Sequence, residues 1–169
     1  FLFKTKFFKV KQINKGRIEK HLLTRKKNKK FQPLTPNIFR YIDVFRKLGF
    51  SINIEDHEFP HKNPIPINFL NLFNNSERKW IGIAPFASYS GKTYPLDLMQ
   101  KIVGFLDQKH TVFLFGFGKF EMGIIEKWSQ AFKNVYSCSC FGGFESEIAI
   151  ISNLDLMVSM DSANGHIAS

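Results

Sequence analysis

Strand-like and helix-like hydrophobic patterns alternate from residue 80 to the end of the chain. Short apolar runs, typical of buried strands, cover residues 80–84, 111–115, 135–136 and 154–160. Between them apolar residues recur at helical spacing, over residues 95–106, 121–132 and 145–152. This alternation predicts an α/β fold: a parallel sheet with helices on its faces.

The same spacing predicts which helix residues face the sheet. Pro95 suits the first turn of the first of these helices. The predicted inward residues of that helix are Leu96, Met99, Ile102, Val103 and Leu106, and those of the next are Ile124, Ile125 and Trp128.

The first part of the chain is less regular. A helix is predicted over residues 37–49, where Gly49 is placed to end it. Its apolar stripe consists of Ile38, Tyr41, Ile42, Phe45 and Leu48. A short strand is expected at 7–10, and a polar connection or an exposed helix at 14–30. Prolines among scattered polar residues mark 51–79 as a linker.

Charge is concentrated at one end of the chain. Residues 1–30 hold twelve lysines or arginines and a single acid, Glu19, whereas residues 31–169 are close to neutral. Three interpretations of the basic segment stay open: a solvated tail, attraction to an anionic membrane surface or lipid acceptor, and nucleic-acid binding. No zinc-finger spacing or other nucleic-acid-binding signature accompanies the charge.

The remaining composition narrows the class of protein. Twenty phenylalanines and 44% apolar residues favour a folded core. No run reaches the roughly 18 apolar residues of a membrane-spanning helix. Cys138 and Cys140 are the only cysteines. One such pair provides neither a disulfide framework nor a four-ligand metal site, so reduced cytosolic thiols are expected.

The candidate chemistry lies in the loops that follow the predicted strands. In open α/β sheets, ligands bind at the carboxyl ends of the strands. The loops at 85–94, 116–120 and 161–165 are all expected at that edge. Lys92 lies among hydroxyl residues and has two interpretations. It could bind a phosphate group, or it could simply be a lysine of a surface loop. The spacing of a Walker loop is absent.

Three further residues have two interpretations each. Glu121 stands where a dinucleotide fingerprint would have its third glycine, so it could bind ribose hydroxyls or serve as a helix N-terminal acid. Asp161 could border a ligand or cap a helix. His166 could border the same ligand or pack at a helix start. A small-residue turn between a strand and a helix start favours a phosphate-bearing ligand.

Four segments in order along the chain resemble glycosyltransferase family 9, the ADP-heptose:lipopolysaccharide heptosyltransferases. They are Ile81-Gly-Ile-Ala-Pro-Phe-Ala-Ser88, Gly91-Lys-Thr-Tyr-Pro95, Phe115-Gly-Phe-Gly-Lys-Phe-Glu121 and Asp161-Ser-Ala-Asn-Gly-His166, with looser likeness at Lys15-Gly-Arg17 and residues 40–49. That family normally carries a bulkier residue than Gly165 in the last turn.

The resemblance implies a GT-B enzyme with two Rossmann-like domains. Residues 1–75 would be the end of the N-terminal, acceptor-side domain with a linker, and residues 76–169 a truncated C-terminal domain that binds a nucleotide sugar. The implied reaction is inverting, metal-independent transfer of a heptose or related sugar from an ADP-heptose-like donor to an anionic lipopolysaccharide-core acceptor. The implied location is cytoplasmic, with peripheral contact at the inner membrane, and no nucleic acid or cofactor is implied.

The resemblance also implies roles for individual residues. Ser88 and Lys92 would bind the donor diphosphate and Glu121 the ribose, and Thr93 belongs to the same set of substrate-binding residues. Asp161, Ser162 and Ala163 would line the sugar-phosphate pocket, with His166 supporting the loop. The general base of this family lies in an early loop of the N-terminal domain, which here would precede Phe1. No catalytic residue is therefore assigned.

The first residue is Phe1 and the last, Ser169, falls within a predicted helix, so we expect an internal fragment that is inactive alone. Two other functions are retained. One is a non-catalytic homologue that binds nucleotide sugars, and the other is a basic nucleic-acid-binding α/β protein.

Overall fold

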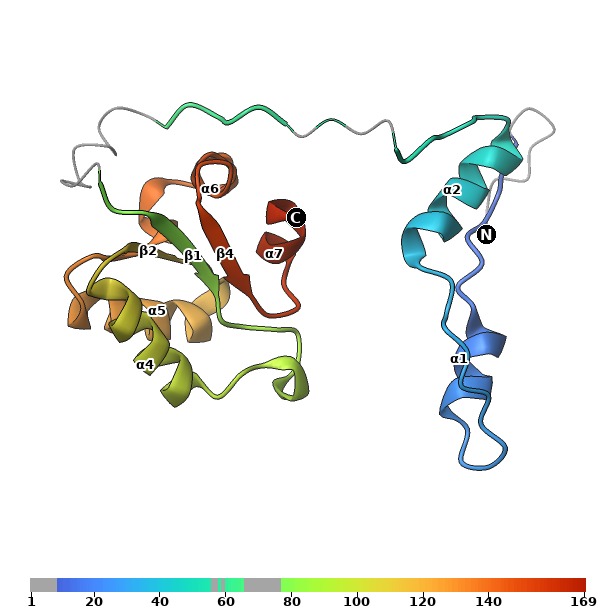
Figure 1. Ribbon diagram of the computed structural model, residues 1–169, viewed down its shortest axis with the longest axis horizontal. Coiled ribbons are helices and arrows are strands. Elements are labelled where there is room, and N and C mark those ends of the chain that lie inside the picture. The colour runs from blue at the N-terminus through green and yellow to red at the C-terminus, as the bar shows by residue number, and fades with distance from the viewer. Residues whose placement is uncertain (1–8, 56–57, 59, 66–76) are drawn as a thin grey trace. The chain divides into compact units, whose positions relative to one another are not determined.

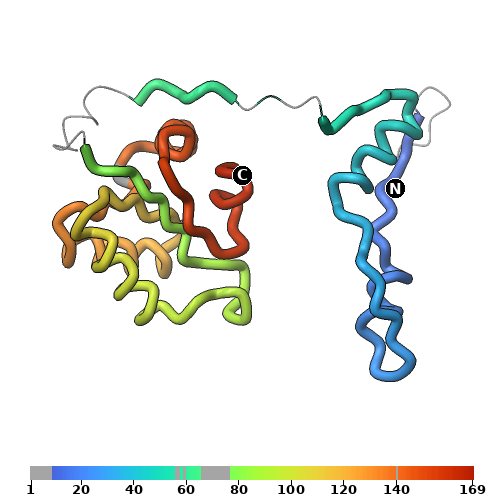
Figure 2. The backbone as a smooth tube through the Cα atoms, in the orientation of Figure 1, coloured from blue at the N-terminus to red at the C-terminus, as the bar shows by residue number. Residues whose placement is uncertain are grey.

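The computed structural model describes residues 9–55, 58, 60–65 and 77–169. The chain divides into two compact units, Phe1–Glu58 and Phe59–Ser169, each considered by itself (Figure 2). The domain boundary expected between residues 75 and 76 lies outside the described residues and stays a prediction. The strand expected at 7–10 lies partly outside them, and Lys9 and Val10 form no regular secondary structure.

The described residues of the first unit form the helices α1 (Arg17–Thr24) and α2 (Asn37–Leu48). Gly49 ends α2 as predicted: its φ of 102° lies in the left-handed region that glycine tolerates, and its amide donates to the Arg46 carbonyl at 3.0 Å. The predicted apolar stripe of α2 is mostly exposed within this unit, since Ile42 is its only buried member.

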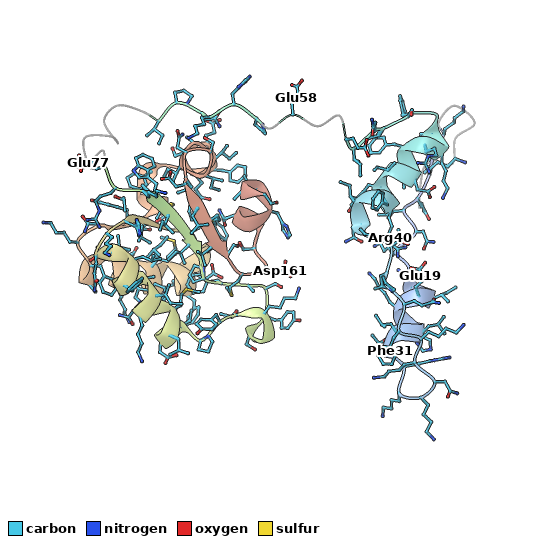
Figure 3. All side chains as sticks on the ribbon, viewed as in Figure 1. Glu19, Phe31, Arg40, Glu58, Glu77 and Asp161 are labelled. Carbon is cyan, nitrogen blue, oxygen red and sulfur yellow. The ribbon has the colours of Figure 1, made fainter. Side chains whose placement is uncertain are left out.

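The side chain of Arg40 in α2 is buried within this unit, with only 5% of its surface exposed. The guanidinium donates to the carbonyls of Asn14 and Thr35, each at 3.0 Å, and to Glu19 Oε2 at 2.6 Å (Figure 3). A Cβ at Gly16 would lie 2.5 Å from Arg40 Nη2, so only glycine fits beside it. These contacts join α1 and α2.

The second unit is built on a four-stranded parallel sheet, shown in Figure 1. Its strands are β1 (Trp80–Ala84), β2 (Thr111–Leu114), β3 (Val135–Ser137) and β4 (Leu156–Ser159). They lie in the order β3-β2-β1-β4. In the central strand, Ile83 pairs with Leu114 of β2 on one side and with Val158 of β4 on the other. The predicted α/β fold with a parallel sheet is therefore confirmed.

Alternate residues of the strands form two core clusters, one on each face of the sheet. On one face the strands pack against α4 (Leu96–Asp107) and α5 (Gly118–Ala131), through Met99, Val103, Ile125 and Trp128. On the other they pack against η2 (Cys138–Phe141) and α6 (Phe144–Ile151). Helices therefore cover both faces, as a parallel sheet requires.

Three details differ from the sequence-based expectation. α5 begins at Gly118 rather than near Glu121, and Gly118 itself takes a left-handed φ of 81°. The last strand is shorter than predicted and covers only Leu156–Ser159. Ile102, predicted to face the sheet, is 37% exposed. It lies at the edge of an apolar face that Met99 and Val103 already fill.

Candidate functional site

The strand order places a topological switch point beside β1. After β1 the chain steps to β2 and β3 on one side, then crosses back through α6 to place β4 on the other (Figure 1). The loops that leave the carboxyl ends of β1 and β4 therefore lie next to each other. Open α/β sheets bind their ligands in the crevice at such a point.

A hollow of about 280 Å³ lies at this edge, and three loops line it. The loop after β1 contributes Phe86, Ala87 and Ser88; the loop after β2 and the start of α5 contribute Gly116, Phe117 and Glu121; the loop after β4 and the start of the helix that follows it contribute Asp161, Ser162, Ala163 and Asn164. Five of the eight residues singled out from the sequence thus share one hollow. Lys92, Thr93 and His166 are not among its lining residues.

Lys92 nevertheless joins the site through an ion pair. It closes the short 3-10 helix η1 (Ser90–Lys92) in the loop after β1, and its Nζ donates to Asp161 Oδ2 after β4. The ammonium also lies 5.4 Å from the centre of the Tyr89 ring. The pair spans the switch point, so it ties together two loops that are 69 residues apart in sequence.

The pair changes the acidity of both groups. The hydrogen bond and charge of Asp161 raise the pKa of Lys92 above its ordinary value, and Lys92 lowers the pKa of Asp161 below its own. His166 contributes a smaller lowering, since its Nε2 lies 3.4 Å from Asp161 Oδ1. Asp161 is therefore held as a carboxylate between a cation and an imidazole.

Glu121 has a structural partner in the described residues. Its Oε2 accepts a hydrogen bond of 2.8 Å from the backbone amide of Phe117, which precedes the first turn of α5. An acidic side chain at a helix start satisfies an amide that the helix leaves unpaired and suits the helix dipole. Of the two interpretations of Glu121, the helix N-terminal acid is observed, and the ribose contact stays a prediction.

Ser162, not Asp161, caps the helix after β4. α7 (Ala163–Ala168) begins directly after Ser162, whose Oγ accepts from the Gly165 amide at 3.2 Å and shares a hydrogen bond of 2.9 Å with Ser159 Oγ. The capping interpretation of Asp161 was wrong, because its carboxylate is engaged by Lys92 instead. A Cβ at position 165 would lie 2.3 Å from Ser159 Oγ, which explains the glycine there.

Thr93 is the one predicted residue without a contact to the hollow or the ion pair. Its Oγ1 donates to the Tyr89 carbonyl at 3.4 Å and closes the η1 turn. Phe117 and Asn164 are among the lining residues of the hollow that sequence reasoning did not single out. Phe117 is 91% exposed, and its place between Gly116 and Gly118 was a signal that could have marked it.

Asn164 links the hollow to α6. Its Nδ2 donates to Oε2 of Glu147, in the first turn of α6, at 3.2 Å. Among the described residues, no helix is long and apolar enough to cross a bilayer.

The strand order and the hollow at the switch point define a doubly wound α/β domain. Residues 2–169 match glycosyltransferase family 9 (heptosyltransferase), and the chain belongs to this family. No curated protein matches the sequence significantly.

Solved structures show the same fold. The E. coli heptosyltransferase WaaC with ADP superposes with a TM-score of 0.56 at 16% identity, over 81% of this chain and 43% of that one. The E. coli ADP-heptose lps heptosyltransferase II superposes with a TM-score of 0.53 at 19% identity, over 75% of this chain and 44% of that one. The chain thus spans less than half of these proteins and corresponds to part of their GT-B fold.

Proposed function

We propose that this chain forms the donor-binding part of a glycosyltransferase. The proposed reaction moves a heptose or a related sugar from a nucleoside-diphosphate donor to an acceptor of the lipopolysaccharide-core type, with inversion at the transferred carbon. The proposed location is cytoplasmic. The observation that carries the proposal is the Lys92–Asp161 pair across the switch point, beside the hollow of the three loops.

Lys92 is proposed to bind the donor diphosphate. An ammonium group has three N–H donors, of which the structure commits one to Asp161. The others can reach phosphate oxygens without loss of the pair. Departure of the nucleoside diphosphate builds negative charge, and a cation fixed there beforehand stabilises it. In this proposal the positive charge at the leaving group comes from Lys92, and no metal is required.

The other residues are proposed to fix the donor. Ser88 lies exposed on the rim of the hollow and would donate to a phosphate oxygen, with Thr93 holding the turn that carries Lys92. Glu121 would accept from the ribose hydroxyls through an oxygen not used by the Phe117 amide.

The turn after β4 would hold the sugar end of the donor. Asp161, with Ser162 and Ala163, would line the sugar-phosphate pocket, and His166 would support that turn through Asp161. The general base is assigned to no residue of this chain.

Structures of E. coli WaaC contain ADP and ADP-2-deoxy-2-fluoro heptose, and these ligands suggest the nucleotide to test. We expect ADP to raise the melting temperature of the chain more than UDP or GDP do, because binding to the folded state stabilises it. Equal response to all three, or response to none, would contradict the proposal.

A matched pair of variants tests the role of Lys92. Lys92→Gln removes the charge and is expected to weaken ADP binding about tenfold or more, since hydrogen bonds to charged groups are the strong ones. Lys101→Gln removes the charge of another exposed lysine, on α4, and should leave ADP binding unchanged. Equal affinities of the two variants would remove Lys92 from the site. ADP binding by a complete enzyme that transfers no sugar would indicate a non-catalytic homologue.

A further inference from the structure

The side chain of Phe117 is exposed to solvent, although the backbone that carries it is held in place. Its ring is 91% exposed, and its amide donates to Glu121 Oε2 at 2.8 Å. The residue has an extended backbone, with φ −137° and ψ 148°, directly before the first turn of α5. A ring presented on a fixed backbone loses little further freedom when a ligand covers it.

The packing of the second unit gives no reason for an aromatic residue at this position. The other two phenylalanines that line the hollow are Phe86 and Phe115, which are 7% and 1% exposed and belong to the two core clusters. Within the described residues, Phe117 belongs to neither cluster. Its ring therefore lines the hollow without contributing to the core.

The strand order places Phe117 on the far side of β1 from β4. The strands lie in the order β3-β2-β1-β4, so the Lys92–Asp161 pair joins the loops after β1 and β4, whereas Phe117 follows β2 (Figure 1). Phe117 and Asp161 nevertheless line the same hollow. A ligand that the pair holds at one end can therefore extend along the carboxyl edge of the sheet toward Phe117.

The parts of a nucleoside diphosphate follow one another in the same direction. Its phosphates come first, then the ribose and then the base. In the proposed function, Lys92 binds the diphosphate and Glu121 binds the ribose hydroxyls. Since the carboxylate of Glu121 also holds the amide of Phe117, a base attached to that ribose lies beside the ring of Phe117.

We propose that the ring of Phe117 stacks on the base of the donor nucleotide. This inference rests on the proposed function, and it makes Phe117 a binding residue that takes no part in the transfer of the sugar. Every base has a π-face, so stacking is tolerant of base identity. Phe117 thus contributes affinity for the base, and the expected preference for ADP over GDP and UDP is not assigned to it.

A matched pair of alanine variants of the whole chain, titrated with ADP, tests the proposal. Phe117→Ala should weaken ADP binding by about tenfold or more, as expected for a lost base–aromatic stack. Phe120 is 74% exposed in the first turn of α5 and is not among the lining residues of the hollow, so Phe120→Ala should leave ADP binding unchanged. Phe117→Trp keeps an aromatic face and should retain the affinity.

Two further measurements separate stacking from a change in the shape of the loop. Inorganic pyrophosphate has neither base nor ribose, so its affinity, measured by competition with ADP, should be the same in Phe117→Ala and in the unchanged chain. In Phe117→Trp, ADP should quench the fluorescence of the added indole. Trp128 is 4% exposed and Trp80 begins β1, at the end of that strand away from the hollow, so neither native tryptophan should respond.

The outcomes distinguish failure of the inference from failure of the proposed function. If the unchanged chain does not bind ADP, the proposed function is wrong and the inference falls with it. If the chain binds ADP and Phe117→Ala binds it equally well, only the inference is overturned. Equal losses in Phe117→Ala and Phe120→Ala, a parallel loss of pyrophosphate binding, or unquenched emission in Phe117→Trp would overturn it too.

Discussion

Gly116 lies where the hollow meets the core, so a single methyl group there should be costly. A Cβ at this position would lie 2.6 Å from Ile125 Cδ1, and 3.0 and 3.1 Å from two ring atoms of Phe86. Ile125 is 0% exposed and has no open space to move into, whereas Phe86, at 7% exposure, can shift only toward the hollow that it lines. Excess volume in a packed core costs about 1–3 kcal/mol. We expect Gly116→Ala to lower the free energy of unfolding of the second unit by that amount.

Gly123 provides the matched control. It lies inside α5, and a Cβ there would have no heavy atom within 4 Å. Alanine is favoured over glycine by up to about 1 kcal/mol inside a helix, so Gly123→Ala should stabilise the unit. The same chemical change at two positions seven residues apart is thus expected to have opposite signs, with a gap of roughly 2–4 kcal/mol.

Guanidinium denaturation followed by tryptophan fluorescence measures this gap. Trp80 and Trp128 are the only tryptophans, and both belong to the second unit, so the signal reports its unfolding. Unchanged stability of Gly116→Ala would show that Phe86 and Ile125 can repack without cost. A loss in Gly123→Ala equal to that in Gly116→Ala would refute the reasoning altogether.

Three other substitutions test contacts described above. Because Lys92 lowers the pKa of Asp161, the stability that the pair gives is present above the ordinary carboxyl pKa and is lost as pH falls through the lowered one. In Asp161→Asn the pKa of Lys92 should return toward its ordinary value in an NMR titration, and an unchanged pKa would rule out the pair in solution. Arg40→Ala leaves two carbonyls and a carboxylate without their donor, so it should lower the free energy of unfolding of the first unit by about 3 kcal/mol. The amides of α1 and α2 should then exchange faster with solvent, and unchanged protection there would contradict this. Ser162→Ala removes a helix cap that contributes about 1 kcal/mol to stability, so the Gly165 amide should exchange faster than in the unchanged chain. An unchanged exchange rate would show that the cap is unimportant.

The elements of the second unit were predictable because each has a strong local pattern. The run Trp80–Ala84 is apolar throughout, and the strand it predicts is present at those residues. The convergence of the three loops could also be predicted, because the carboxyl ends of parallel strands lie at the same edge of the sheet. Sequence patterns do not fix strand order, however. Contact between Lys92 and Asp161 depends on β4 lying beside β1, and no local signal gives that neighbour.

Other features depend on partners that the sequence does not reveal. Arginine is almost always exposed, so the burial of Arg40 could not be foreseen without Glu19, which lies 21 residues away. Asp161 and Ser162 are both good capping residues, and the choice between them depends on the residue at which α7 begins. Gly118 obscured the start of α5, because glycine usually argues against a helix.

The crossover between β3 and β4 determines when the Lys92–Asp161 pair can form during synthesis of the chain. Synthesis delivers Lys92 long before Asp161, and the two can meet only when β4 docks beside β1. A nascent chain that has paired β1, β2 and β3 but has not yet released β4 therefore has no Lys92–Asp161 contact. In the proposed donor site, nucleotide binding that needs this pair would begin only after β4 has docked.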